Sequence, residues 1–242
     1  MRQPAQDRGR RRRDALLDAG VELLTEGGFA AVSHRAVADR AGLPLAATTY
    51  YFRSRADLIA AAFERMADRD LATTRDRFTA QVERLRAEST GAMSTATSTA
   101  RSTDAESTGA TSRAGSGAAP AGGTGPGMSA RAAAEALAAA LLPHDETERR
   151  RHLALWELYL HAGRDPALRP LARTWTDRCR ATTSELLNIA GYPATDAAVR
   201  LLGAAADGLA VEAVVEARPN AIQSMVEIMS RAFDWIRTTE GA

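Results

Sequence analysis

Residues 32–58 read VSHRAVADRAGLPLAATTYYFRSRADL, and this stretch decides the fold. Ser33 predicts the start of a short helix, because a serine hydroxyl can accept hydrogen bonds from the free N–H groups of a first helical turn. Gly42 predicts the end of that helix, since glycine tolerates the left-handed backbone that closes many helices. Pro44 stands where a second short helix, over residues 45–52, is expected to begin. Two short helices joined by a glycine-containing turn are typical of a helix-turn-helix.

Helices are also expected on both sides of this stretch. Apolar residues recur at helical spacing from 16 to 23, and Gly27 and Gly28 predict where that helix stops. Ser54 and Asp57 have the three-residue spacing of a capping box, with Asp in place of Glu, which predicts the start of a long helix. The N-terminal domain is therefore expected to hold three short helices over residues 10–55, followed by a connecting helix over 56–88.

The same stretch resembles the DNA-binding signature of the TetR family. The resemblance covers about residues 10–65 and rests on the Ala-Gly turn, the small residues that open the third helix, the aromatic pair before Phe52 and the basic Arg55. It implies a homodimeric transcription regulator that binds a palindromic operator in double-stranded DNA. It further implies a repressor that a small-molecule ligand of unknown identity releases from the operator. Leu45 and Ala46 stand where the family commonly has Lys or Gly, so the resemblance does not predict which bases are contacted there.

Nine residues are expected to contact DNA. Thr48 and Thr49 can offer hydroxyls and methyls to base edges, whereas tyrosines next to them can reach phosphates. Arg55 is expected to clamp a phosphate at the first turn of the long helix. The full set is Ser33, Arg35, Leu45, Ala46, Thr48, Thr49, Tyr50, Tyr51 and Arg55.

Several of these assignments have structural alternatives. Tyr50 and Tyr51 can pack beneath the short helices instead of touching DNA, and Arg55 can be an ordinary surface charge. The basic run at residues 10–13 is either an arm on the DNA backbone or in the minor groove, or a solvated, disordered start of the chain.

The distribution of charge favours a polyanionic partner for the N-terminal domain alone. The net charge of the 242 residues is +1, and all 31 basic residues are arginine. Residues 1–55 carry 10 arginines against 6 acidic residues, whereas the remainder carries 21 against 24.

The composition indicates a soluble protein of a reducing cytoplasm, and the resemblance to the TetR family implies a bacterial protein that associates with the nucleoid. The single cysteine, Cys179, excludes an intrachain disulfide and suits a reducing compartment. No run of 18 apolar residues predicts a membrane span, and no signal peptide is expected. We expect no cofactor and no metal, because no close His/Cys spacing recurs.

The rest of the chain is expected to form a larger helical bundle, so the fold class is all-α. Residues 89–128 are predicted to be a disordered loop, because Ser, Thr, Ala, Gly and Pro fill 34 of the 40 positions. The ligand-binding and dimerisation domain is expected over residues 129–240. Its predicted helical segments are 129–142, 146–162, 167–190, 195–218 and 220–238.

The bundle is the expected place for the ligand and for the second subunit. Candidate ligand-binding residues combine aromatic walls with a few polar groups, namely Trp156, Tyr159, Leu160, Trp175, Cys179 and Asp207. The alternative for each is ordinary core packing. The last two segments are expected to form the dimer interface through Leu201, Leu202, Leu209, Val215, Ile222, Val226, Met229 and Phe233, with Gly203, Ala204 and Gly208 allowing close approach, unless they pack within one chain.

The sequence therefore predicts a DNA-binding transcription regulator with no enzymatic activity. An activator or a ligand-independent regulator of the same fold remains an alternative. A helical enzyme is disfavoured because no acid, base and nucleophile converge in the sequence. A helical interaction protein is disfavoured by the acidic balance beyond residue 55.

Overall fold

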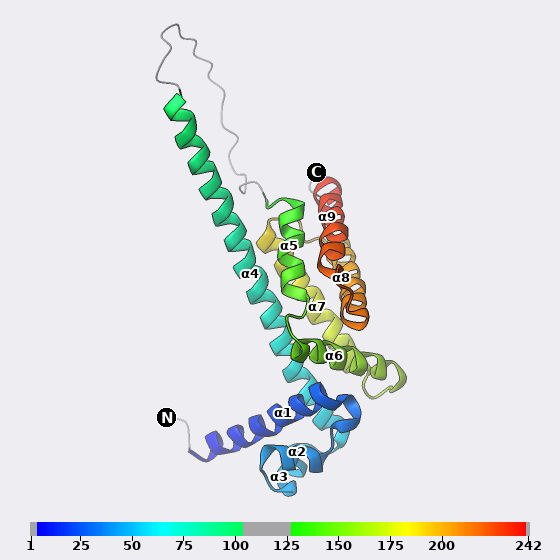
Figure 1. Ribbon diagram of the computed structural model, residues 1–242. Coiled ribbons are helices and arrows are strands. Elements are labelled where there is room, and N and C mark those ends of the chain that lie inside the picture. The colour runs from blue at the N-terminus through cyan, green and yellow to red at the C-terminus, as the bar shows by residue number, and fades with distance from the viewer. Residues whose placement is uncertain (1–3, 104–126, 241–242) are drawn as a thin grey trace.

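The computed structural model describes residues 4–103 and 127–240, and within these ranges the chain forms nine helices and no strand (Figure 1). The helices are α1 (Pro4–Ala31), α2 (His34–Ala41), α3 (Leu45–Tyr51), α4 (Arg55–Thr103), α5 (Ala130–Leu141), α6 (Glu146–Arg164), α7 (Arg169–Ala190), α8 (Asp196–Glu216) and α9 (Ala221–Glu240). The all-α prediction is confirmed.

The N-terminal helices end and begin at the residues that the sequence indicates. The Ser33 hydroxyl accepts a hydrogen bond from the Ala36 N–H at 3.1 Å, so Ser33 is the N-cap of α2. Gly42 closes α2 with a φ of 62°. The Ser54 hydroxyl accepts from the Asp57 N–H at 3.1 Å at the start of α4. These caps set both ends of α2 and the start of α4.

A break interrupts α1 near its end. Gly27 has φ −137° and ψ 15°, and Gly28 has φ 64° and ψ −160°, a backbone conformation that is essentially restricted to glycine. The last turn, which contains Phe29, is therefore separated from the long first part of α1. The predicted stop at the glycine pair is confirmed.

The long helix α4 joins the two halves of the molecule. Its 49 residues extend for roughly 70 Å at 1.5 Å per residue. Phe63 and Met66 are buried against α1 in the N-terminal core, whereas Phe78 and Val82 are buried in the core of the bundle. Figure 1 shows α4 running from the short helices past the full height of the bundle.

The structure corrects the predicted start of the loop at residue 89. The helix continues to Thr103, because Ala, Ser and Thr extend an existing helix at little cost when no proline intervenes. Residues 104–126 of the predicted loop lie outside the described residues. At its far end Met128 is fixed, since its N–H donates to the Ala190 carbonyl at 3.1 Å and its own carbonyl accepts from the Tyr192 hydroxyl at 2.9 Å.

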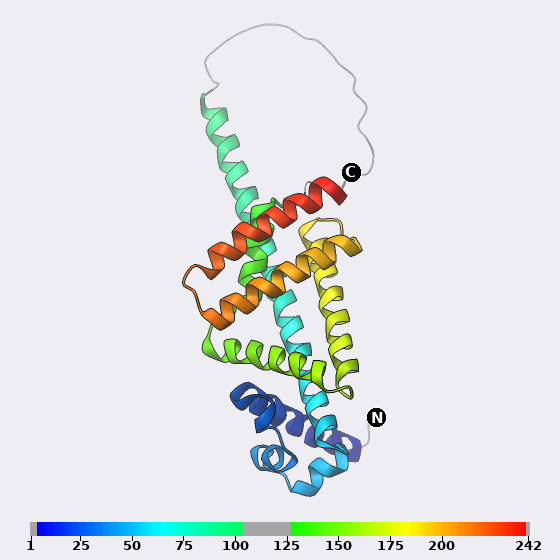
Figure 2. The same ribbon diagram turned by 90° about the vertical axis from the view of Figure 1, so that its right-hand side faces the viewer.

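The bundle is built around α5, whose alanines allow close packing. Seven of its twelve residues are buried, among them Ala133, Ala134 and Leu137, and the helix packs mainly against α9 and α4. Figure 2 shows α6 lying across the molecule between this bundle and the short N-terminal helices. Among the residues that the structure describes, none of the helices combines the length and the hydropathy that a membrane span requires.

Ion pairs fasten α4 to its neighbours. Arg65 donates to Asp18 of α1 at 2.8 and 3.0 Å and to Asp14 at 3.2 Å. Farther along α4, Arg77 donates to Glu148 of α6 at 3.1 Å. This hydrogen bond lowers the pKa of Glu148 to about 2.

Candidate functional site

One face of α3 is open to solvent and carries four of the residues predicted to contact DNA. Leu45 is 50% exposed and Tyr50 is 82% exposed, and Ala46 and Thr49 are exposed between them. The spacing i, i+1, i+4 and i+5 places these side chains on one side of the helix. The exposed face of α3 therefore carries the small side chains of Ala46 and Thr49 between Leu45 and the aromatic ring of Tyr50.

Thr48 does not belong to this face. Its side chain is fully buried, and its hydroxyl donates to the Leu45 carbonyl at 2.8 Å. Thr48 is rotated by about 100° from Thr49 around the axis of α3, and the packing of α3 on α1 and α2 covers it. Its predicted role in reading base edges is wrong in this geometry, and Thr49 is left as the exposed threonine.

Tyr51 holds α3 to α1. Its hydroxyl donates to the Gly9 carbonyl at 2.9 Å, and its half-buried ring meets the Tyr50 ring edge-on with centroids 4.9 Å apart. The packing alternative therefore describes Tyr51, whereas the exposure of Tyr50 leaves it free for a partner.

Arg55 has structural partners where a phosphate clamp was predicted. Its Nε donates to the Val32 carbonyl at 2.7 Å and its Nη2 to the Phe29 carbonyl at 2.6 Å. Its guanidinium also lies over the Phe29 ring, 4.5 Å from the centroid. The last carbonyls of a helix have no partner within that helix, so Arg55 satisfies two acceptors where α1 ends. The side chain thereby joins the start of α4 to the segment between α1 and α2.

The start of α2 presents a different set of groups. The Ser33 hydroxyl is occupied by its capping bond, whereas Arg35 is exposed and has no ion pair within the described part of the chain. The Nδ1 atom of His34 is buried and has no hydrogen-bond partner in the structure. Arg35 is the residue at this helix start that can reach a neighbouring anion.

The sequence prediction missed Arg53. This residue lies exposed between α3 and α4, directly after the aromatic run, and no ion pair engages it in the described residues. Its place beside the exposed face of α3 gives it the access to phosphate that was assigned to Arg55. In the sequence, the position of this basic residue directly after Phe52 could have indicated a phosphate contact.

The arginines at residues 10–13 are helical, so the predicted disordered start is wrong, whereas their contact with the DNA backbone stays a prediction. They form the middle of the first long section of α1. Arg10 pairs with Asp7 at 3.0 Å, and the guanidinium of Arg13 lies 5.9 Å from the centroid of the Phe52 ring.

The predicted ligand-binding residues lie on α6, α7 and α8 but do not converge on one cavity. Trp175 meets Phe63 edge-on at 5.7 Å in the N-terminal core, whereas Trp156 packs against the core of the bundle. Leu160 is 69% exposed, and the Tyr159 hydroxyl lies 3.3 Å from the Thr176 hydroxyl. The aromatic residues therefore act largely as packing residues.

Cys179 and Asp207 form part of a polar cluster between helices. Burial and the carboxylates of Asp207 and Asp70 raise the pKa of the Cys179 thiol to about 12. Burial likewise raises the pKa of Asp70, whereas Asp207 is an exposed residue of α8. The structure thus brings together acidic groups from α4 and α8 beside α7, and Asp70 is a member that the sequence prediction did not include.

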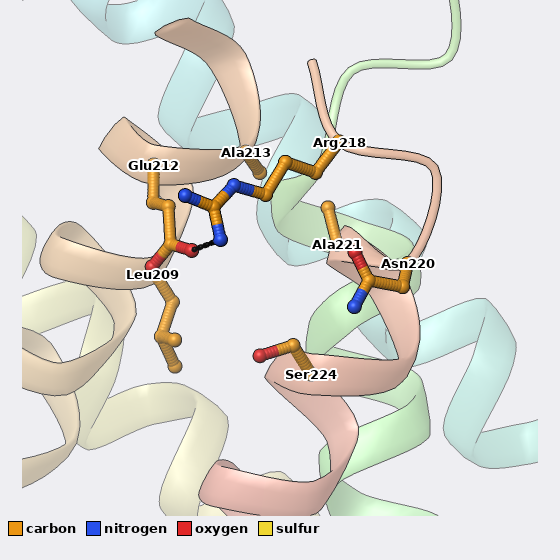
Figure 3. A pocket seen from close by; sticks show the side chains of 7 residues that line it. All are labelled: Leu209, Glu212, Ala213, Arg218, Asn220, Ala221 and Ser224. Carbon is orange, nitrogen blue, oxygen red and sulfur yellow. Dashed lines mark ion pairs between the residues drawn. The ribbon is translucent and has the colours of Figure 1, made fainter. Parts of the chain in front are cut away.

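Two hollows of the described surface lie elsewhere. The first, about 60 Å³, lies where α8 turns into α9, and Figure 3 shows Arg218 reaching across it to Glu212, with N and O 3.5 Å apart. The second, about 260 Å³, is an open groove between α4 and α7 that includes Leu71 and Thr182. Neither contains a predicted ligand-binding residue.

The predicted dimer face divides between the core and the surface. Leu202, Val226, Met229 and Phe233 are buried within the chain, so their assignment to the interface is wrong. The apolar residues that remain exposed on α8 and α9 are Leu201, Val211, Val215, Ile222, Ile228 and Trp235, with Ala204 and Gly208 between those of α8. We call this set the α8–α9 stripe.

Helix α6 contacts the N-terminal domain directly. The centroid of the His161 ring lies 4.1 Å from that of the Phe29 ring, and the guanidinium of Arg55 lies over the same Phe29 ring. The carboxylate of Glu157 lies so close to Gly28 that no Cβ would fit there without displacing it. The break in α1 is thus the place where the bundle meets the helix-turn-helix.

Comparison with known proteins assigns both parts of the chain. A model of bacterial regulatory proteins of the tetR family matches residues 16–62, and a model of the tetracyclin repressor-like C-terminal domain matches residues 128–234. No curated protein sequence matches the chain.

Solved structures share the fold over nearly the whole chain. SCO7518 of Streptomyces coelicolor A3(2) is 24% identical with a TM-score of 0.61, covering 92% of this chain and 98% of that one. The multidrug binding protein EbrR in complex with imidazole is 26% identical with a TM-score of 0.57, covering 92% and 94%. EbrR in complex with ethidium is 25% identical with a TM-score of 0.55, covering 91% and 97%.

Proposed function

The chain is a transcription regulator of the TetR family, and we propose that it is a repressor that binds a palindromic operator as a homodimer. A small molecule bound in the C-terminal bundle releases the DNA. In this proposal the protein works in the bacterial cytoplasm on the nucleoid and catalyses no reaction.

The exposed face of α3 is the observation that carries the proposal. A helix enters the major groove only with a slim, solvent-facing side, and Ala46 and Thr49 provide it. Tyr50, at the end of this face, is placed to contact the sugar-phosphate backbone. Arg35 and Arg53 flank the same surface with charges that no acidic side chain of the described chain neutralises.

The α8–α9 stripe supports the homodimer. Val215 and Ile222 are 56% and 63% exposed, and apolar side chains gathered on two long helices favour association with a second copy. Two copies joined there present two α3 helices, which fit successive major grooves when they lie about one turn of DNA apart. Val215→Asp with Ile228→Asp is expected to convert the dimer to a monomer in sedimentation experiments.

The acidic cluster of the bundle supports a cationic effector. Asp70 and Asp207 both lie close enough to Cys179 to raise the pKa of its thiol, and negative charge gathered around one point favours a cationic ligand there. Ethidium, present in an EbrR structure, is a planar aromatic cation and serves as the first probe. Asp207→Asn is expected to weaken ethidium binding by about tenfold, which corresponds to roughly 1.4 kcal/mol.

The contact between α6 and the end of α1 gives the effector a route to the DNA-binding surface. A shift of α6 moves His161 and Glu157, which touch Phe29 and Gly28. Phe29 in turn touches Arg55, which holds the first turn of α4. A ligand that favours one position of α6 thereby favours one spacing of the two α3 helices.

Selection of DNA by the purified full-length protein tests the proposal. The protein is incubated with a random pool of duplexes at fixed salt concentration, and the bound sequences are determined. We expect an inverted repeat, and release of the selected duplex by ethidium at a lower concentration for the wild-type protein than for Asp207→Asn, a comparison that is needed because ethidium also intercalates into duplex DNA. Failure to enrich any sequence contradicts the DNA-binding role, whereas enrichment with no release by cationic compounds contradicts only the effector assignment.

A further inference from the structure

The first turns of α1 lie outside the N-terminal core. The first buried core residue is Leu16, whereas the helix begins at Pro4. All five arginines between positions 8 and 13 are exposed. Figure 1 shows this part of α1 projecting beyond α2 and α3. Burial in the N-terminal core therefore does not account for the position or the charge of this extension.

Two contacts fix the extension to the end of α3. The Gly9 carbonyl accepts the Tyr51 hydroxyl at 2.9 Å, and the Arg13 guanidinium lies 5.9 Å from the centroid of the Phe52 ring. Tyr51 is the last residue of α3 and Phe52 is its C-cap. The extension therefore keeps a defined position relative to the proposed recognition helix.

The helical repeat shows which arginines face the DNA-binding side. Glu22 and Glu26 of α1 both pair with Arg40 of α2, at 3.2 and 2.7 Å, so their face of α1 is turned towards α2. Arg8 and Arg12 precede Glu26 by 18 and 14 residues, about 5.0 and 3.9 turns, so they lie on the same side of the helix as Glu26. Arg10 lies on the opposite side of the helix, and Arg11 lies about 60° around the axis from Arg8, in a direction between Glu22 and Asp18.

Charge on this face is not compensated within the protein. No acidic side chain in the described chain pairs with Arg8 or Arg12. They are four residues apart, about 6 Å along the helix axis, and can act together. Exposed arginines beside a major-groove helix are suited to the phosphates that flank the groove.

We propose that Arg8 and Arg12 form a second DNA-contacting surface, which binds backbone phosphates flanking the half-site read by α3. This inference rests on the proposed function. It makes the extension a rigid, preformed part of the interface rather than an arm that becomes ordered on the DNA. These contacts add affinity and length of footprint but no sequence preference.

The test compares two double variants with equal loss of charge. R8Q/R12Q and R10Q/R11Q are measured on the duplex that the wild-type protein selects from the random pool, at several salt concentrations. For R8Q/R12Q we expect the slope of log affinity against log salt to fall by about 1.8 per bound protomer, at about 0.9 per lost phosphate contact. We expect hydroxyl-radical protection to be lost at the flanks while the selected sequence stays the same.

R10Q/R11Q is expected to change the slope by less than half as much, and both variants should keep the wild-type Tm because the side chains are exposed. A third variant, Tyr51→Phe, keeps every charge but removes the bond to Gly9, and flank protection should weaken there too. Equal slopes for the two double variants, or an unchanged footprint in R8Q/R12Q, would overturn the inference. If the wild-type protein selects no duplex, the proposed function itself fails.

Discussion

Replacing Arg55 by Ala distinguishes a structural role for this side chain from a phosphate contact. The change removes hydrogen bonds to two carbonyls, at 2.7 and 2.6 Å, and the contact with the Phe29 ring. Each bond at this partly exposed position contributes about 1 kcal/mol, and the contact with the ring adds about 0.5–1 kcal/mol. We therefore expect the free energy of unfolding to fall by about 2–3 kcal/mol, and the Tm by roughly 4–10 °C.

Arg53→Ala is the matched control, since it removes the same charge two residues earlier from a side chain with no ion pair in the described chain. We expect it to leave the Tm unchanged and to lower the salt slope of DNA binding by about 1 per protomer. Arg55→Ala should lower the Tm and leave the salt slope of DNA binding unchanged. Differential scanning calorimetry and fluorescence anisotropy on the selected duplex measure the two quantities. An unchanged Tm together with a lower slope for Arg55→Ala would refute the structural role.

Three further changes test other parts of the structure. Tyr50→Ala should weaken operator binding by about tenfold or more without lowering the Tm, because the ring is 82% exposed; unchanged affinity at fixed salt would remove Tyr50 from the interface. Gly28→Ala should cost about 1–3 kcal/mol of stability in chemical denaturation, since φ is +64° and Glu157 occupies the space of a Cβ; a wild-type midpoint would contradict this. Arg77 lowers the pKa of Glu148 from 4.5 to about 2, so the stability that the pair contributes is full above about pH 5 and is lost as the pH falls towards 2. Glu148→Gln should therefore destabilise the protein by about 1–2 kcal/mol at pH 7, after allowance for solvent screening, and by much less near pH 2; a difference independent of pH would argue against the ion pair.

The sequence predicted the elements of the fold well because their ends are set by local chemistry. Ser33 and Gly42 determine the bounds of α2 through hydrogen bonds within a few residues, and such bonds are visible in a sequence. The end of α4 was less predictable, since alanine, serine and threonine are compatible with both helix and loop.

The roles of individual site residues depended on contacts across the fold. Tyr50 and Tyr51 are identical in the sequence, yet one is exposed and the other is bonded to a carbonyl 42 residues away. Arg55 and Arg53 differ in the same manner, because only Arg55 reaches the end of α1. Asp70 was missed because the cluster that contains it draws residues from helices far apart in the chain.

Because α4 packs on α1 up to Ala67 and pairs with it at Arg69, and enters the core of the bundle at Phe78, we expect it to act as a lever that pivots between Arg69 and Phe78. From Asp70 to Arg55 the arm is roughly 22 Å long, so a tilt of about 10° moves the first turn of α4 by about 4 Å. In the proposed homodimer such tilts would move the two arms in opposite directions, and the distance between the α3 helices would change by about 8 Å against the roughly 34 Å of one turn of DNA. A displacement of an ångström or so beside the fulcrum is therefore magnified into a mismatch of about a quarter of a helical turn.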